Sequence, residues 1–260
     1  MKLNKIRAFF FDLDGVLSVG KENPRALGGH AVVAKIKSLG KKAFVLTNDS
    51  THTREELRAN LLRMGFDFST DEILTSSFLT AHYLTQKIGK SNFFLVGERG
   101  LLLELEAAGH QPAEDKPDVV VVGLDRHLTY DKLDRAMRSV RNGATLVGSY
   151  GGAVYMSDHG PALSAGPIVK ALEFASGKRA IMIGKPSPRM FKLALTLSGA
   201  KASDAVMIGD QIETDLSGAR RAGVHTALVL TGVETMETIR NSKLKPDLVL
   251  ETVDELADYI

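Results

Sequence analysis

The sequence contains no cysteine among its 260 residues. That absence excludes disulfide bonds, thiolate-bound metal sites and a cysteine nucleophile. The rest of the composition is ordinary: hydrophobic residues make up 44% of the chain and charged residues 25%. These fractions are close to the averages for globular domains, so we expect a chain that buries a normal hydrophobic core.

The sequence also lacks an excess of charge of one sign and lacks long apolar runs. Its net charge is +2, from 33 basic and 31 acidic side chains, without a concentrated Lys/Arg run. This balance argues against a nucleic-acid partner. No stretch approaches the roughly 20 apolar residues that span a bilayer, and the apolar run before Asp12 is too short for a signal peptide. We therefore expect a cytoplasmic protein with no membrane partner.

Short apolar runs alternate with longer segments of helical period along the chain. This pattern predicts βαβ units around a parallel sheet and places the chain in the α/β class. The runs are apolar without alternation, as in strands that are covered on both faces. We predict strands over 8–11, 43–46, 119–122, 180–183, 205–208 and 226–230. We predict helices over 30–39, 53–64, 130–141 and 188–198.

Two loop-like stretches lie in the middle third of the chain, and no internal repeat or low-complexity segment is evident. One is the polar, Pro-containing 110–118, and the other is the Gly-rich 148–167. Their position hints at a middle module with its own loops, although composition alone does not define its limits.

Carboxylates follow two of the predicted strands at the point where each strand ends. Asp12 and Asp14 follow the first strand, and Asp210 follows the strand 205–208 with Asp215 five residues later. Open α/β folds bind ligands at the carboxyl ends of their strands. Hard oxygen ligands of this kind suit Mg²⁺ rather than zinc.

Two other strand ends carry groups that suit a phosphate. Thr47, Asn48 and Asp49 follow one strand, and Lys185 follows another just before a predicted helix. Hydroxyl, amide and ammonium groups, together with the N–H groups of a helix N-terminus, bind phosphate oxygens.

Each of these residues also has a simpler interpretation when it is taken alone. An Asp or a Thr-Asn pair after a strand commonly caps a helix or forms a turn, and a lone lysine is commonly solvated. Four such ends in one α/β chain favour a combined metal and phosphate site. Other motifs are excluded by spacing: the "GKS" at 89–91 lacks the earlier glycine of a P-loop, and "DLDG" lacks the glycine position of an EF-hand.

The motifs at these strand ends resemble those of the haloacid dehalogenase (HAD) superfamily. The matching segments are "DLDGV" at 12–16, "TN" at 47–48, "GKPSP" around Lys185 and "GDQIETD" at 209–215. Segments such as "VVVVGLDRHLTYDKL" and "LVLTGV" are similar to the NagD / 4-nitrophenylphosphatase branch, subclass IIA with a C2-type cap. The resemblance covers nearly the whole chain. It implies a Rossmann-like core over 1–78 and 179–260, with an inserted α/β cap domain over 79–178.

The resemblance also implies the catalytic and metal-binding roles. Asp12 is expected to be the nucleophile that forms an aspartyl-phosphate. Asp14 is expected to be the general acid and then the base that activates water. Mg²⁺ is expected to be held by the side chains of Asp12 and Asp210 and by the backbone carbonyl of Asp14. Asp215 is expected to orient the waters of the metal or Lys185.

The remaining motif residues are expected to contact the substrate. Lys185 and Thr47 would hold phosphate oxygens, and Asn48 would help to position the substrate. Asp49 stands where relatives commonly have asparagine, so it adds negative charge next to these residues. We count it among the substrate-binding residues.

The expected activity is hydrolysis of a small phosphate monoester. Dehalogenases of the superfamily lack the second aspartate, so Asp14 argues against that reaction, and the caps of phosphomutases usually lie elsewhere in the chain. The alternative from another class is a phosphometabolite-binding or sensor protein with negligible catalysis.

The substrate itself is left open by the sequence. The loop 148–152 stands where the branch often has "TNPD", and its Tyr150 either contacts the leaving group or is an exposed structural residue. The expected partner is a small phosphorylated metabolite. Relatives of this branch often associate through their caps, so a homo-oligomer formed through the cap is a further expectation.

Overall fold

A computed structural model describes residues 3–20, 23–157 and 159–260. The chain divides into two compact units. Unit 1 consists of residues 1–47, 55–74 and 185–260, and unit 2 consists of residues 48–54 and 75–184. None of the helices in the described ranges is long and apolar enough to cross a membrane.

Unit 1 is built around a six-stranded sheet with the order β15-β14-β13-β1-β4-β5. The pairs β1–β13, β1–β4, β13–β14 and β14–β15 are parallel. The strands are β1 (Ala8–Phe11), β4 (Lys42–Thr47), β5 (Ile73–Thr75), β13 (Ala205–Gly209), β14 (His225–Val229) and β15 (Leu248–Leu250). Because β1 lies between β13 and β4, it is central and all four of its residues are buried.

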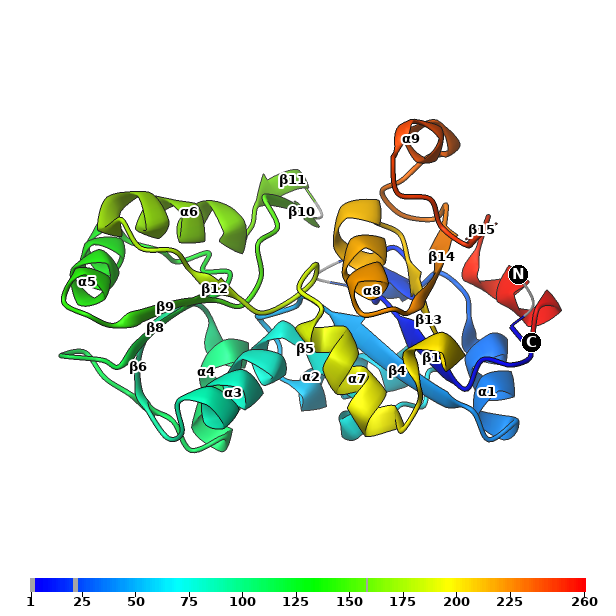
Figure 1. Cartoon of the computed structure of the whole chain (residues 1–260), viewed down its shortest axis with the longest axis horizontal. Helices are drawn as coiled ribbons and strands as arrows, with labels where there is room; N and C mark the ends of the chain where they lie inside the picture. Colours follow the sequence, from blue (N-terminus) through cyan, green and yellow to red (C-terminus); the bar gives the residue numbers. More distant parts are fainter. Residues whose placement is uncertain (1–2, 21–22, 158) are drawn as a thin grey trace. The chain divides into compact units, whose positions relative to one another are not determined.

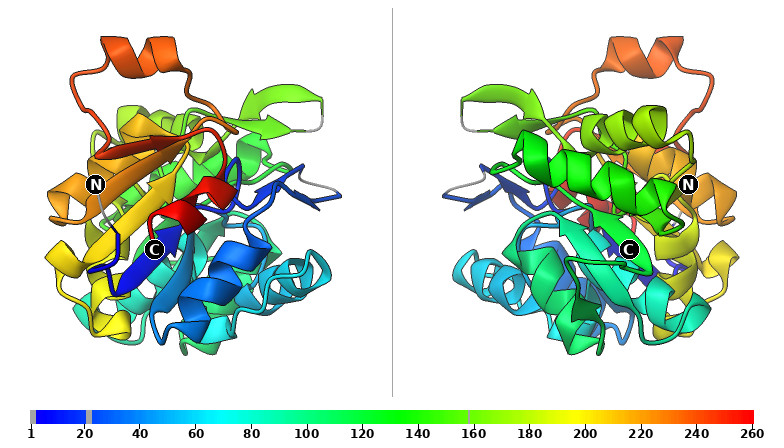
Figure 2. Two further views of the ribbon diagram at one scale, coloured as in Figure 1. Left: turned by 90° about the vertical axis from the view of Figure 1, so that its right-hand side faces the viewer. Right: turned by 90° about the vertical axis from the view of Figure 1, so that its left-hand side faces the viewer.

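Helices cover both faces of this sheet (Figure 2). Phe9 and Phe11 belong to one core cluster that also contains Val32 and Ile36 of the first helix, whereas Phe10 packs edge to face on Phe44. The alternation follows from the two-residue period of a strand.

The helices of unit 1 are α1 (His30–Ser38), α2 (Arg54–Arg63), α7 (Arg189–Ser198), α8 (Ser217–Arg221) and α9 (Met236–Asn241). Shorter turns are η1 (Thr70–Glu72), η2 (Ala202–Asp204), η3 (Ile212–Leu216) and η4 (Val253–Asp258), and a small ribbon pairs β2 (Ser18–Val19) with β3 (Arg25–Ala26).

Unit 2 contains a second parallel sheet with the order β12-β9-β8-β6-β7. Its strands are β6 (Asn92–Val96), β7 (Gln111–Pro112), β8 (Val119–Val122), β9 (Thr145–Gly148) and β12 (Ile181–Met182). Its helices are α3 (Ser76–Lys87), α4 (Arg99–Ala107), α5 (Tyr130–Arg141) and α6 (Ala165–Ser176). Helices α5 and α6 lie on one face of the sheet and α3 and α4 on the other, and an antiparallel hairpin pairs β10 (Val154–Ser157) with β11 (Gly160–Leu163) (Figure 1).

The α/β fold expected from the sequence is confirmed, and most of the predicted elements match the observed ones to within one residue. The strand predicted over 180–183 is observed as the shorter β12, which pairs with β9 in the sheet of unit 2. An apolar run indicates a buried strand but does not specify its sheet.

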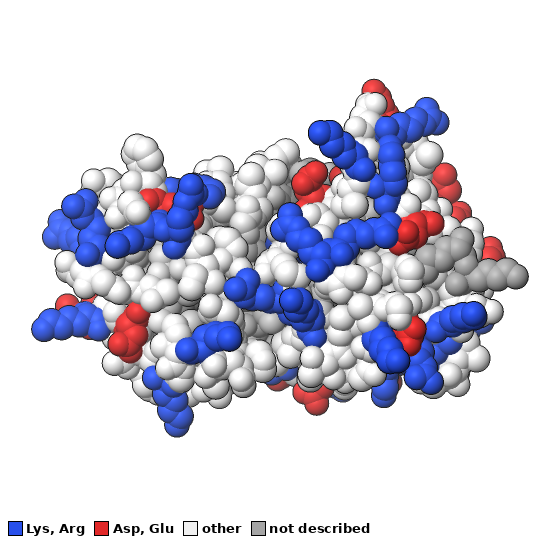
Figure 3. Space-filling view, in the orientation of Figure 1, with Lys and Arg blue, Asp and Glu red and all other residues white. Residues whose placement is uncertain are grey.

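Lys and Arg side chains are scattered over the face shown in Figure 3, with Asp and Glu side chains among them. The expectation of no nucleic-acid partner stays a prediction. The same holds for the division into a core over 1–78 and 179–260 and a cap over 79–178.

The central position of β1 generates a prediction about stability. Phe9 is fully buried, whereas Phe174 on α6 is 93% exposed. Replacing a buried phenylalanine by alanine removes apolar contacts and leaves a cavity, so Phe9→Ala should lower the free energy of unfolding of unit 1 by about 3–5 kcal/mol. The same change at Phe174 should alter stability by less than about 0.5 kcal/mol. Urea denaturation of both variants checks this, and equal effects would contradict the assigned core.

Candidate active site

Asp12 directly follows β1, and its backbone still pairs with the neighbouring strand. Its backbone N–H donates to the carbonyl of Ile208 on β13 at 2.9 Å. Its side-chain Oδ1 accepts a hydrogen bond from the N–H of Leu13 at 2.7 Å, and the residue is only 7% exposed. The strand therefore fixes this carboxylate at the carboxyl edge of the sheet, where α/β folds bind ligands.

Asp210 comes directly after β13, the neighbour of β1, and lies among glycines. Its Oδ2 accepts a hydrogen bond from the N–H of Val233 at 2.9 Å. A Cβ atom at Gly232 would lie 2.0 Å from Oδ2, and one at Gly15, whose φ is +78°, would lie 2.5 Å from it. Neither position can carry a side chain without moving this carboxylate, so the two glycines allow the backbone to approach it closely.

Lys185 joins Asp12 to Asp215. Its Nζ lies 2.7 Å from Asp12 Oδ1 and 2.7 Å from Asp215 Oδ1, and it also donates to the carbonyl of Leu46 on β4 at 2.9 Å. The ammonium group is thus surrounded by oxygen atoms, although its side chain is only 2% exposed. Lysine is almost never buried this deeply without such partners.

Asp215 sits in the wide helical turn η3 and is fully buried. Its Oδ2 accepts a hydrogen bond from the N–H of Gln211 at 3.2 Å. A Cβ atom at Gly209 would lie 2.4 Å from the Cβ of Asp215, so the turn packs directly on the end of β13. Asp215 contacts Lys185 at 2.7 Å, and its orienting role stays a prediction.

Burial changes the proton affinity of these groups. Desolvation, and next the charge of Asp215, raise the pKa of Asp12 to about 7, although Lys185 opposes the shift. Desolvation, and then the charges of Asp215 and Asp12, raise the pKa of Asp210 to about 8. For Lys185 desolvation favours the neutral form, but the attraction of Asp12 and Asp215 prevails and raises its pKa. The site therefore concentrates more negative charge than its own lysine neutralises.

The donor set fits a hard divalent metal ion. One ligand atom from each of Asp12, Asp210 and Asp215 lies within 4.8 Å of the others, and all three residues are buried. Among the described residues, Oδ1 of Asp210 is buried and accepts no hydrogen bond. A buried carboxylate oxygen without a partner is costly, and a cation would satisfy it. The backbone carbonyl of Asp14, expected as a ligand, stays a prediction.

Asp14 and Thr47 lie near the ends of the two central strands. Asp14 is half-buried in the turn after β1 and forms a backbone bridge with Ser18. Thr47 is the last residue of β4 and is 1% exposed. Both residues belong to unit 1, as do Asp12 and Lys185.

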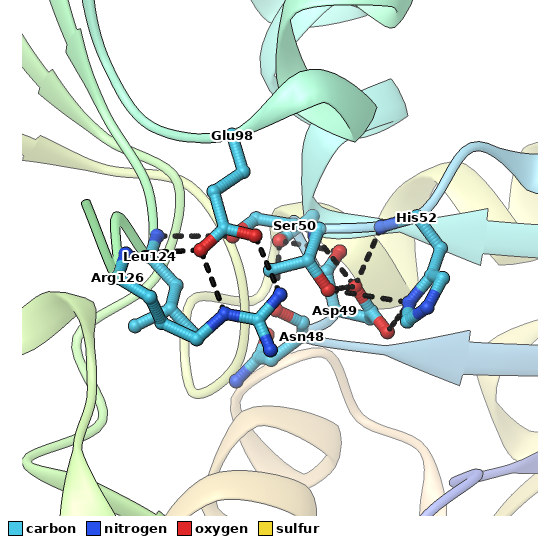
Figure 4. Close-up of polar contacts among 9 residues, drawn as sticks. Asn48, Asp49, Ser50, His52, Glu98, Leu124 and Arg126 are labelled. Atoms are coloured by element: carbon cyan, nitrogen blue, oxygen red, sulfur yellow. Dashed lines mark hydrogen bonds and ion pairs between the residues drawn. The ribbon is translucent and has the colours of Figure 1, made fainter. Parts of the chain in front are cut away.

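Asn48 and Asp49 belong to unit 2, although Asn48 is bonded directly to Thr47. Oδ1 of Asp49 accepts hydrogen bonds from the N–H groups of Thr51 and His52 at 2.6 and 3.1 Å, and its Oδ2 lies 2.8 Å from Nδ1 of His52 (Figure 4). These contacts engage both oxygens of Asp49 in the loop itself. Its expected role in substrate binding stays a prediction.

Tyr150 is buried rather than exposed. Its side chain is 8% exposed, and its hydroxyl oxygen accepts a hydrogen bond from Oγ of Ser164 at 2.7 Å. The alternative of an exposed structural tyrosine is therefore wrong. A contact of Tyr150 with the leaving group stays a prediction.

Sequence reasoning missed three contributors to the site: Gly232 and Val233 after β14, and the carbonyl of Leu46. The strand β14 was predicted, but the "TGV" that follows it carries no charge and attracted no functional interpretation. A main-chain carbonyl leaves no residue-type signal in a sequence.

Comparisons with known proteins agree with this geometry. Residues 9–111 match the family described as haloacid dehalogenase-like hydrolase, and residues 182–256 match a second family described as HAD-hydrolase-like. The dihydroxyacetone phosphatase of Corynebacterium glutamicum (strain R) is 31% identical over 96% of this chain and 90% of its own length. The acid sugar phosphatase of Staphylococcus aureus (strain USA300) is 30% identical over 97% of both chains.

Solved structures give the same result. The 4-nitrophenylphosphatase of Thermotoga maritima superposes with a TM-score of 0.92, at 32% identity over 98% of both chains. NagD from E. coli K-12 superposes with a TM-score of 0.87, at 30% identity over 96% of this chain and 98% of that one. The chain therefore belongs to the haloacid dehalogenase-like hydrolases, in their NagD- and 4-nitrophenylphosphatase-like branch, and is a phosphoric monoester hydrolase.

Proposed function

We propose that the protein is a Mg²⁺-dependent phosphatase that hydrolyses a small phosphate monoester through an aspartyl-phosphate on Asp12. The observation that carries this proposal is the contact of Lys185 Nζ with Asp12 and Asp215, both at 2.7 Å, beside Asp210. This arrangement brings carboxylate oxygens and an ammonium group together at one edge of a sheet. Phosphoryl transfer is catalysed mainly by such positioning and charge compensation.

Asp12 has the features of a positioned nucleophile. Its Oδ1 is engaged by Lys185 and by the N–H of Leu13. Oδ2 is therefore the oxygen that we assign to attack on phosphorus. The P–O bond to Asp12 forms as the bond to the leaving oxygen breaks, and the leaving oxygen takes a proton.

Asp14 supplies that proton in the proposed mechanism and later accepts one from water. It is half-buried, so it can reach solvent, and it is two residues from the nucleophile. Water then attacks phosphorus, and inorganic phosphate leaves while Asp12 is regenerated. Lys185 and Thr47 would hold the phosphate oxygens in both steps.

Mg²⁺ would be held by the side chains of Asp12 and Asp210 and by the backbone carbonyl of Asp14. The ion would offset the charge that otherwise repels a phosphate from three carboxylates. The raised pKa values of Asp12 and Asp210 support this, because a divalent cation stabilises the ionised form of both groups.

The proposed substrate is a small phosphorylated metabolite. The names of the relatives, a dihydroxyacetone phosphatase and an acid sugar phosphatase, support a phosphorylated sugar or triose as its class. The proposed catalytic core is 1–78 with 179–260, and the proposed cap is 79–178. A homo-oligomer formed through the cap stays a prediction.

The first test removes the nucleophile. With Mg²⁺ and 4-nitrophenyl phosphate the wild-type protein should release phosphate, and Asp12→Asn should lower kcat by about 10⁴-fold or more because an amide oxygen cannot attack phosphorus productively. Asp71→Asn, which changes an exposed carboxylate of η1, is the matched control and should retain full activity. Steady-state kinetics check this, and turnover retained in Asp12→Asn would exclude the proposed nucleophile.

The second test concerns Asp14 as the general acid. Asp14→Asn should impair hydrolysis of an alkyl phosphate, whose leaving oxygen needs a proton, by at least about tenfold more than that of 4-nitrophenyl phosphate, whose leaving group needs little help. The measurement is kcat for both esters in both proteins. An equal loss for the two esters would argue against proton donation by Asp14.

The third test uses the pH dependence of stability. The pKa values of Asp12 and Asp210, about 7 and about 8, lie above the ordinary 3.8. In the metal-free protein their contribution to stability is therefore fully present below pH 3.8 and is lost as the pH rises through about 7 to 8. Because Mg²⁺ competes with protons for these groups, the increase in Tm on adding Mg²⁺ should grow from acidic to alkaline pH.

Asp210→Asn removes one of these buried charges while keeping the acceptor for Val233 N–H. At pH 8 the metal-free variant should melt higher than the metal-free wild type, by about 2–4 °C for each kcal/mol gained. Its response to Mg²⁺ should be lost. Asp125→Asn, which changes a buried carboxylate paired with Lys132, should keep the Mg²⁺ response. A lower Tm with an intact Mg²⁺ response in Asp210→Asn contradicts the proposed metal site.

A further inference from the structure

The boundary between the two units falls between Thr47 and Asn48, two adjacent residues that are both proposed to contact the substrate. Thr47 and Lys185 belong to unit 1 with the nucleophile, whereas Asn48 belongs to unit 2. Asn48 begins a segment, Asn48 to Arg54, that returns to unit 1 at residue 55. The contacts of this segment within unit 2 explain why it belongs there.

Ser76 holds the start of the segment. Its Oγ lies 2.9 Å from the carbonyl oxygen of Asn48 and 3.0 Å from that of Asp49, so one donated hydrogen is shared between them. Ser76 is fully buried and is the first residue of α3. The N-terminus of α3 is itself fixed, since Oγ1 of Thr75 accepts a hydrogen bond from the N–H of Phe78 at 3.0 Å. Ser76 is therefore a buried donor on a rigid element.

Ser50 and Thr51 hold the middle of the segment. The N–H of Leu124 donates to Oγ of Ser50 at 3.1 Å (Figure 4). The N–H of Gly100 donates to the carbonyl of Thr51 at 3.2 Å. A Cβ atom at Gly100 would lie 2.5 Å from that carbonyl oxygen, so α4 approaches the segment at van der Waals distance only because residue 100 is glycine. The segment is thus bound to three different parts of unit 2.

Arg54 holds the end of the segment. Its backbone N–H and its Nε both donate to Oε1 of Glu104 at 3.2 Å. Its guanidinium group stacks over the ring of Phe78 at 3.7 Å, and Glu104 is only 6% exposed. A buried charge-assisted pair of this kind is stronger than an ordinary surface contact.

The side chain of Asn48 is confined as well as its backbone. A Cβ atom at Gly184 would lie 2.5 Å from Oδ1 of Asn48, so the amide packs directly on the backbone of that glycine. Gly184 is held in turn, because its N–H donates to the carbonyl of Ser149 at 2.7 Å. Gly184 of unit 2 therefore limits where the Asn48 amide can lie.

We propose that Ser76 and Ser50 are positioning residues that hold Asn48 on unit 2, so that the contact of Asn48 with substrate depends on unit 2. This inference rests on the proposed function, in which Asn48 positions the substrate. Thr47 and Lys185 depend instead on the sheet of unit 1. Two neighbours in the "TN" motif then belong to different structural units, and the hydroxyl of Ser76 contacts the backbone of the second.

Helix α3 offers a matched pair of variants for a test. Ser76 and Ser77 are adjacent and both fully buried, but Oγ of Ser77 has no hydrogen-bond partner among the described residues. Ser76→Ala should reduce kcat/KM for 4-nitrophenyl phosphate in the presence of Mg²⁺ by about tenfold, with most of the change in KM, because a buried hydrogen bond is lost. Ser77→Ala should stay within about twofold of the wild type. Equal kinetics for the two variants would overturn the proposal.

A double variant separates positioning from general stability. If Ser76 acts through Asn48, Ser76→Ala should have almost no further effect on kcat/KM in an Asn48→Ala background. If Ser76 contributes only to folding, its effect on kcat/KM should be the same in both backgrounds. The second result would contradict the positioning role even if Ser76→Ala lowers Tm.

Amide hydrogen exchange tests the anchoring without relying on activity. The N–H groups of Thr51 and His52 donate to Asp49 inside the segment. They should exchange about tenfold faster in Ser76→Ala than in the wild type, and at the wild-type rate in Ser77→Ala. An inactive wild-type protein would contradict the proposed function, whereas equal exchange in the two variants would contradict anchoring by Ser76.

Discussion

A single buried ammonium group connects the strand ends at the carboxyl edge of the unit 1 sheet. Lys185 Nζ lies 2.7 Å from Asp12 at the end of β1, 2.7 Å from Asp215 in η3 and 2.9 Å from the carbonyl of Leu46 on β4. Three separate parts of the chain therefore have to converge on one cation. Removing Asp12 or Asp215 leaves the buried ammonium group with one carboxylate partner fewer, and weakening a buried ion pair in this way is costly.

The charges around Lys185 do not balance. Three buried carboxylates and one ammonium leave two negative charges in excess, and the pKa values of Asp12 and Asp210 rise in response. Such a cluster contributes little to stability, and the phenylalanines of β1 and the apolar residues around them supply the burial that the sheet needs. Gly232 brings the backbone against Asp210, where any side chain would collide with the carboxylate. The repulsion among these carboxylates destabilises the folded protein at a site where a bound metal ion would offset it.

Much of the fold and part of the site could be predicted from the sequence. The strands that carry Asp12 and Asp210 were evident because both are continuously apolar, and the fourfold recurrence of polar strand ends indicated one ligand site. The pairing of Ala8 with Ala205 across the chain was not evident, because period and composition describe local structure and not sheet neighbours. For the same reason the sequence did not indicate that β12 joins the sheet of unit 2 or that Asn48 belongs to unit 2. Tyr150 shows a similar limit, since it is buried and its hydroxyl accepts a hydrogen bond from Ser164, fourteen residues away, and local sequence indicates neither.

The central claim is that Asp12 becomes covalently phosphorylated during turnover. The most direct measurement is mass spectrometry of the protein after rapid mixing with Mg²⁺ and excess 4-nitrophenyl phosphate and quenching in acid within one turnover. We expect one phosphoryl group on the peptide that contains Asp12, appearing before free phosphate reaches its steady-state rate of release. Turnover that proceeds with no phosphoryl group on that peptide, or with one on a different residue, would contradict it.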